Sequence, residues 1–199
     1  MSATGKIVLA VLAVLWMPVA GHGQAAGEKA PSQNEARHPD FAPLKALIGQ
    51  WSGHGAGQPG NSDVQRSYRI GVGGAFVVVE NQSVYAPQKA NPSGERHVDH
   101  SLIGYDRARK KYVMRQFHAE GFVNQYVLDE MAPDGTKLVW LTETIENISP
   151  GWRAKETYLV KSPDEFTEVF ELAQPGKDFE VYTKNEFRRV NSDAQRGGR

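Results

Sequence analysis

The 199-residue chain contains no cysteine. No disulfide can therefore staple the fold, no cysteine can act as a nucleophile, and no lipid can be attached through a lipobox cysteine. A Gly-x-Ser-x-Gly nucleophile elbow is also missing, which removes the commonest serine-hydrolase signature. Stability must come from a packed core, and the chain is long enough to form one.

An excess of charge of one sign is missing as well. Lys and Arg number 23, and Asp and Glu number 23, so the formal net charge is +0. A basic surface that would attract nucleic acid or an anionic membrane is therefore not expected. The sequence carries no signal that sets the oligomeric state.

The chain has a single long hydrophobic run, residues 7–20, which follows Lys6 and is too short to span a bilayer comfortably. Small residues at Gly23 and Ala25 suit a cleavage site, so residues 1–25 are predicted to be a secretory signal peptide. We expect export to the periplasm or the medium, with no membrane insertion after cleavage. The alternative is an uncleaved N-terminal anchor.

Two polar segments flank the remaining sequence. Residues 26–39 and 191–199 are small, polar and charged, so the first is predicted to be a flexible linker and the second a disordered tail. A single domain is predicted at residues 40–190. It opens with a short helix in which Asp40 is the expected N-cap, and Gly49 ends that helix.

Beyond Gly49 the apolar period changes from 3.6 to 2, and short turns such as Pro133-Asp134-Gly135 separate the segments. Sequential strands without intervening helices form an antiparallel meander, and closure removes its exposed edges. We therefore predict an all-β, ten-stranded, antiparallel up-and-down barrel. The expected strands are 50–57, 64–71, 75–86, 97–105, 110–119, 122–130, 136–146, 151–161, 164–172 and 178–190.

Three motifs resemble a family of uncharacterised bacterial calycin-like β-barrels. They are 47–53 (LIGQWSG), 73–80 (GGAFVVVE) and 104–106 (GYD) followed by 111–113 (KYV). The family is related in fold to lipocalins, fatty-acid-binding proteins and nitrobindin-type haem barrels. The resemblance covers about residues 41–190 and implies an interior that could hold a ligand.

Several residues of these motifs are expected to be structural. Paired glycines permit a sharp corner, an aspartate can cap a turn, and in calycins an arginine of the last strand covers the tryptophan of the first. Arg188 and Arg189 lie on opposite faces of the last strand, and the sequence does not fix which face is inside, so either could take that role. Arg188 is the candidate. The expected structural residues are Gly49, Trp51, Gly73, Gly74, Tyr105, Asp106 and Arg188.

Metal and haem sites are not predicted. His97 and His100, with His118 on the next strand, form the most metal-like cluster, but residues three apart on a strand face opposite ways. The nitrobindin resemblance implies an iron-ligating histidine near the C-terminus, and the last strand has none. His118 on another wall is the remaining conceivable haem ligand, so no cofactor is expected.

Some predicted strands place one polar residue in an apolar face, as Glu156 does between Ala154 and Tyr158. An unpaired buried carboxylate is costly, so this pattern suits a cavity that holds water or a ligand. The alternative is that such faces meet solvent. Predicted ligand-binding residues are Met114, Gln116, His118, Asn124, Tyr126, Glu143, Glu156 and Tyr158.

The leading hypothesis is an exported barrel that binds a small hydrophobic or amphipathic molecule without catalysis. One alternative is an enzyme that uses Glu143 or Glu156 with His118 as an acid–base pair. The other is a structural envelope protein whose barrel is filled by side chains such as Trp140, Trp152, Phe166 and Phe170.

Overall fold

The computed structural model describes residues 41–190. The predicted signal peptide, linker and tail, and the expected N-cap Asp40, lie outside the described residues. Within the described part no helix is long and apolar enough to cross a membrane.

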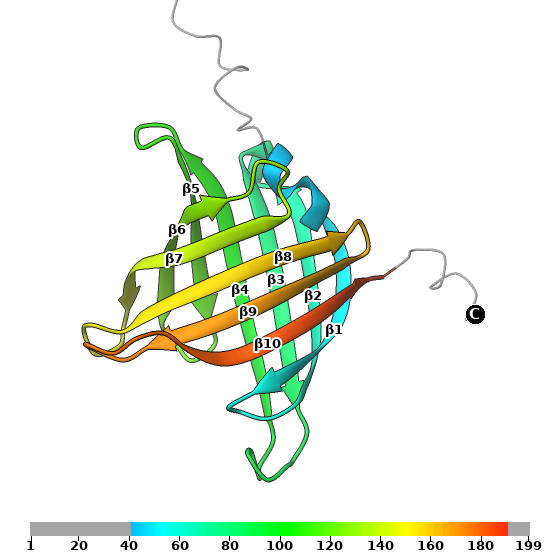
Figure 1. Ribbon diagram of the computed structural model, residues 1–199, viewed down its shortest axis with the longest axis vertical. Helices are drawn as coiled ribbons and strands as arrows, with labels where there is room; N and C mark the ends of the chain where they lie inside the picture. Colours follow the sequence, from blue (N-terminus) through cyan, green and yellow to red (C-terminus); the bar gives the residue numbers. More distant parts are fainter. Residues whose placement is uncertain (1–40, 191–199) are drawn as a thin grey trace, which may run out of the picture. The chain divides into compact units, whose positions relative to one another are not determined.

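Ten antiparallel strands close into a barrel in which each strand pairs with its neighbours in sequence. The ring closes where β1, in cyan, lies beside β10, in red, with Trp51 opposite Arg189 (Figure 1). The predicted fold class is confirmed. The strands are β1 Gly49–Gly57, β2 Ser62–Gly71, β3 Phe76–Tyr85, β4 Glu95–Asp106, β5 Lys111–His118, β6 Val123–Met131, β7 Lys137–Glu146, β8 Arg153–Ser162, β9 Glu165–Ala173 and β10 Glu180–Arg189.

The N-terminal helix is a short 3-10 helix, η1, at Ala42–Leu47. Pro43 occupies its first turn and no side chain caps it, which suits a tight helix held by packing. Leu44 and Leu47 are buried in the core, and the Trp51 indole nitrogen donates to the Leu47 carbonyl at 2.7 Å. A second short helix, η2 at Val72–Gly74, joins β2 to β3.

The barrel has two ends, which we call the helix end and the mouth. The helix end carries η1 and the turns that follow β2, β4, β6 and β8; the mouth carries the turns that follow β1, β3, β5, β7 and β9. The long connection between β3 and β4 projects at the mouth (Figure 1).

The interior is divided into two levels. Next to the helix end lies an apolar level in which aromatic rings stack edge-on or face-on, as Phe166 does against Trp51 at 4.7 Å and Phe187 at 4.5 Å. Nearer the mouth the inward side chains become polar. The apolar level contains Leu44, Leu47, Trp51, Tyr68, Val77, Val79, Ile103, Met114, Tyr126, Leu138, Trp140, Tyr158, Phe166 and Phe187.

Candidate functional site

A cavity of about 570 Å³ opens at the mouth and extends to the polar level. Its rim is largely apolar, with Phe122, Ile145, Ile148, Trp152 and Leu172 among the lining residues. Its floor is formed by buried polar residues that we call the polar girdle: Arg66, Asn81, Asp99, Gln116, Asn124, Glu156, Glu168 and Asn185.

A buried ion pair lies at the centre of the girdle. The Arg66 guanidinium donates to both Glu168 carboxylate oxygens, at 2.9 and 2.8 Å, and Asn185 donates to Glu168 Oε2 at 2.8 Å. Burial by itself would lower the pKa of Arg66, but the negative charge of Glu168, its hydrogen bond and the nearby Tyr68 and Tyr158 together outweigh burial and raise it. Arg66 therefore keeps its charge inside the barrel, where bidentate pairing satisfies it.

Amide side chains extend this network round the wall. Arg66 Nε donates to Asn81 at 2.9 Å, and Asn81 donates to Asp99 at 2.7 Å. Gln116 donates to the other Asp99 oxygen at 3.0 Å and accepts from Asn124 at 3.2 Å. The buried Asn124 Oδ1 has no hydrogen-bond partner among residues 41–190, which costs about 1–3 kcal/mol if left so.

Glu156 is a second buried carboxylate in the floor and has an altered acidity. It accepts a hydrogen bond of 2.6 Å from the Tyr158 hydroxyl. Burial, reinforced by the negative charge of Glu168, raises the pKa of Glu156 to about 7. Near neutral pH this group can therefore either give or take a proton.

Two histidines and a glutamate meet at one side of the rim. His97 Nδ1 lies 2.8 Å from Glu120 Oε1, and His97 Nε2 lies 3.4 Å from His118 Nδ1. Burial lowers the pKa of His118 to about 4. Burial acts in the same direction on His97, but hydrogen bonds to Asp99 and Glu120 outweigh it and raise the pKa of His97 to about 9.

The predicted ligand-binding residues fall into three groups. Gln116, His118, Asn124 and Glu156 line the cavity. Met114, Tyr126 and Tyr158 belong to the apolar level beneath it, although the two tyrosine hydroxyls contact the girdle. Glu143 forms the third group by itself, because it does not line the cavity.

Glu143 lies on the outer face, contrary to our expectation that it lines the mouth. The pairing of β6 with β7 shifts here, so that Gln125 opposes Thr144 while Tyr126 opposes Thr142. Glu143 is the extra residue of this β-bulge, and it binds Arg109 at 2.6 Å. Buried Trp140 and Thr142 already point Glu143 outward by alternation, and the bulge then lets Ile145 face the cavity.

Arg189, and not the Arg188 that we expected, covers Trp51. Its guanidinium carbon lies 4.2 Å from the centre of the indole ring, and it donates to the carbonyls of Ala46 and Ile48. Arg188 points outward to Glu165. The parity follows from Phe187, whose buried ring places the next residue outside and the one after it inside.

The remaining expected structural residues lie at turns of the helix end. Gly49 has a φ of 137°, and a Cβ there would meet the Arg189 guanidinium. Gly73 and Gly74 both have positive φ in η2. Asp106 accepts from the Arg109 amide at 3.0 Å and so caps its turn, while Tyr105 packs edge-on against Tyr112.

Sequence reasoning missed five of the eight girdle residues, together with Glu120 of the rim, and it considered His97 only for a metal site that it did not predict. A usable signal was present, because Arg66 alternates with Val64 and Tyr68, and Glu168 with Phe166 and Phe170, as Glu156 does with its neighbours. The missed girdle residues are Arg66, Asn81, Asp99, Glu168 and Asn185.

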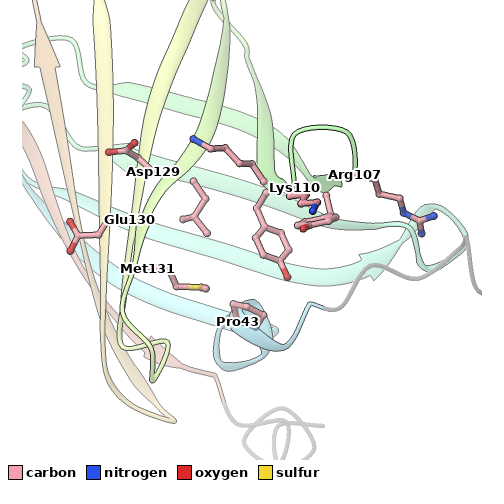
Figure 2. Close-up of a pocket in the computed structure, with 10 residues that line it drawn as sticks. Pro43, Arg107, Lys110, Asp129, Glu130 and Met131 are labelled. Atoms are coloured by element: carbon pink, nitrogen blue, oxygen red, sulfur yellow. The ribbon is translucent and has the colours of Figure 1, made fainter.

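A second depression, of about 610 Å³, lies at the helix end between η1 and strands β4 to β6. Figure 2 shows its labelled residues, and the charged ends of Arg107, Lys110, Asp129 and Glu130 do not converge on one point. All four are exposed. The depression therefore offers a weaker site than the mouth cavity.

Haem does not fit the residues of the last strand. The inward side chains of β10 are Thr183, Asn185, Phe187 and Arg189, none of which ligates haem iron.

No protein-family model matches the sequence, and no curated protein matches it. The crystal structure of Rv2717c from M. tuberculosis is similar in fold, with a TM-score of 0.61 and 18% identity over 78% of this chain and 99% of that chain. A redesigned β-barrel, b11L5F_LGL, has a TM-score of 0.40 and 9% identity over 75% and 96% of the two chains. A fluorescence-activating β-barrel designed de novo has a TM-score of 0.40 and 13% identity over 74% and 96%.

Proposed function

We propose that the barrel binds a small amphipathic molecule in the mouth cavity. The observation that carries this proposal is one cavity with an apolar rim above a floor of buried polar and charged groups. Small-molecule sites combine mainly apolar walls with a few convergent polar groups, in volumes of roughly 300–1,000 Å³. The apolar part of the ligand would contact the rim, and its head group would reach the girdle.

The charges of the lining favour a head group that donates hydrogen bonds or is cationic. Carboxylates outnumber cationic groups, and the Arg66 guanidinium is already neutralised by Glu168. The unpartnered Asn124 Oδ1 adds a further acceptor. The lining carboxylates are Glu95, Asp99, Glu120, Glu156 and Glu168.

Native mass spectrometry of the protein purified gently from its own host tests the proposal first, because a co-purifying molecule would reveal the ligand class. Calorimetric titration of the full chain with dodecylamine, dodecanol and dodecanoate, each below its micelle concentration, then compares head groups on one chain. We expect the amine to bind most tightly and the carboxylate least. A folded protein that carries no molecule and binds none of the three would instead indicate a filled structural barrel.

Two glutamates that differ in position provide matched variants. Glu156→Gln removes a carboxylate of the floor and should weaken amine binding about tenfold or more at pH 8. Glu143→Gln removes an outer-face carboxylate and should leave binding unchanged. Equal effects of the two substitutions would place the ligand elsewhere.

An acid–base enzyme is the second candidate, favoured by the pKa of Glu156 near the working pH. Incubation of the co-purified molecule with excess protein, followed by chromatography and mass spectrometry, would detect conversion. Conversion that Glu156→Gln or His118→Ala abolishes would establish catalysis; an unchanged molecule supports binding alone.

We also propose that the chain is an exported calycin-like barrel. The proposal rests on the signal-peptide pattern of residues 1–25 and on the motifs at residues 47–53, 73–80 and 104–113. Cell fractionation followed by N-terminal sequencing tests export. Recovery from the cytoplasm with Met1 intact would contradict it.

A further inference from the structure

His97, His118 and Glu120 approach one another because of how β4 and β5 pair. Asp99 lies opposite His118, which makes His97 the diagonal neighbour of His118 on the inner face. The β5–β6 turn then folds back, with the Gly121 amide donating to the His118 carbonyl at 2.9 Å. This turn brings Glu120 over the His97 ring.

The three side chains carry potential ligand atoms that lie close enough to share one metal ion. One candidate ligand atom of each lies within 4.8 Å of the other two. The nearest nitrogens of His97 and His118 are 3.4 Å apart. Two ligands about 2.05 Å from a tetrahedral zinc ion lie about 3.3 Å apart, so the imidazoles need little movement to share one ion.

Neighbouring residues hold both rings in place. The His118 ring stacks on Phe122 at 4.0 Å, and its Nε2 lies 3.1 Å from the Asn124 amide nitrogen. Asp99 Oδ2 lies 3.5 Å from His97 Nε2. Because His97 Nε2 is also the nitrogen nearest His118, Asp99 adds negative charge beside the position that a shared ion would take.

We propose that His97, His118 and Glu120 bind a divalent transition-metal ion of the zinc class at the mouth of the barrel. All three residues line the cavity, so a fourth coordination position faces its interior. Two imidazoles and one carboxylate suit zinc better than calcium or magnesium, which prefer oxygen ligands. The inference is independent of the proposed small-molecule ligand.

The test is calorimetric titration of the full chain, without a histidine tag, with ZnCl₂ at pH 7.5, and with CaCl₂ for comparison. We expect one equivalent of Zn²⁺ to bind at this site and no Ca²⁺. Glu120→Gln, a change in an exposed turn residue, should weaken Zn²⁺ binding at least about tenfold, and His118→Ala should weaken it further. Co²⁺ should give the intense visible absorption of a four-coordinate site, and Glu120→Gln should diminish it.

His100→Ala is the matched control, because His100 lies three residues from His97 but is exposed on the outer face. It should bind Zn²⁺ like the unsubstituted chain, which shows that His100 is not a ligand. His118→Ala keeps His22, His38 and His54, so weakened binding there shows that these histidines do not supply the affinity. The inference is overturned if the unsubstituted chain binds no Zn²⁺ or if Glu120→Gln binds it unchanged. The three residues would then form only an ion-paired cluster.

Discussion

The two levels of the barrel interior are made by the same strands and have opposite chemistry. Along β10 the inward residues change from Phe187 to Asn185, and along β4 they change from Ile103 to Asp99. The change occurs at a similar height round the wall, so that a packed apolar level supports a polar girdle. Apolar packing is therefore concentrated at the helix end, and buried polar and charged side chains are concentrated toward the mouth.

The largest effect should come from the apolar level. Phe166→Ala removes a ring that contacts Trp51 and Phe187 and should lower the free energy of unfolding by about 3–5 kcal/mol. Phe170→Ala, on the same strand but beside the cavity, should cost clearly less. Urea denaturation measures both, and equal losses would contradict the division into two levels.

Breaking the central ion pair should have an effect nearly as large. Arg66→Met leaves Glu168 buried without its partner and should lower the free energy of unfolding by about 3–5 kcal/mol. The double variant Arg66→Met/Glu168→Leu removes both charges and should recover most of that loss. A double variant no more stable than the single one would show that the ion pair adds net stability, and that its attraction does more than offset the cost of burying the two charges.

The acidity of Glu156 predicts a stability difference that depends on pH. Its pKa in the fold, about 7, is above the ordinary value, so the folded protein holds a proton that the unfolded chain has lost. The contribution of Glu156 to the free energy of unfolding is therefore fully present below about pH 4.5 and is lost as the pH rises through about 7. The stability of the unsubstituted chain relative to Glu156→Gln should fall from pH 5 to pH 8 in denaturation experiments. A difference that rises or stays flat would mean that Glu156 is ionised in the fold.

The two arginines at the end of β10 should differ in a smaller way. Arg189→Ala uncovers Trp51 and leaves the carbonyls of Ala46 and Ile48 without their donor, at a cost of about 1–3 kcal/mol. Arg188→Ala removes only an exposed pair with Glu165 and should change the melting temperature little. The opposite order would mean that closure depends on Arg188.

The smallest effect should come from the outer face. Glu143→Gln breaks an exposed pair with Arg109, so no measurable change in melting temperature is expected. Glu156→Gln changes the same residue type on the next strand but inside the barrel. Thermal melting of the two variants side by side tests whether inside and outside positions differ as the structure indicates.

Much of the fold could be predicted because its signals are local. A period of two and turn residues marked ten strands, and the structure places each within a few residues of its expected position. The helix was anticipated, but it is a 3-10 helix without a side-chain cap. Which residues face the interior could not be predicted beyond a β-bulge, because an extra residue such as Glu143 reverses the faces after it without a clear mark in the sequence.

The candidate site was only partly predictable, because its residues come from strands that meet through register. Gln116, His118, Asn124 and Glu156 could be proposed from single-strand patterns. The contact of His97 with Glu120 depends on the pairing of β4 with β5 and on the fold of a turn. The pairing of Arg66 with Glu168 joins residues 102 positions apart.

The sequence by itself determined the class of fold, because hydrophobic alternation and turn chemistry act over a few residues. It also determined that no disulfide supports the barrel. Only the tertiary structure decided which arginine covers Trp51, which glutamate lies inside and which histidine pairs with Glu120. Those choices depend on strand register, bulges and closure, which are set by the packing of the whole barrel and not by any one segment.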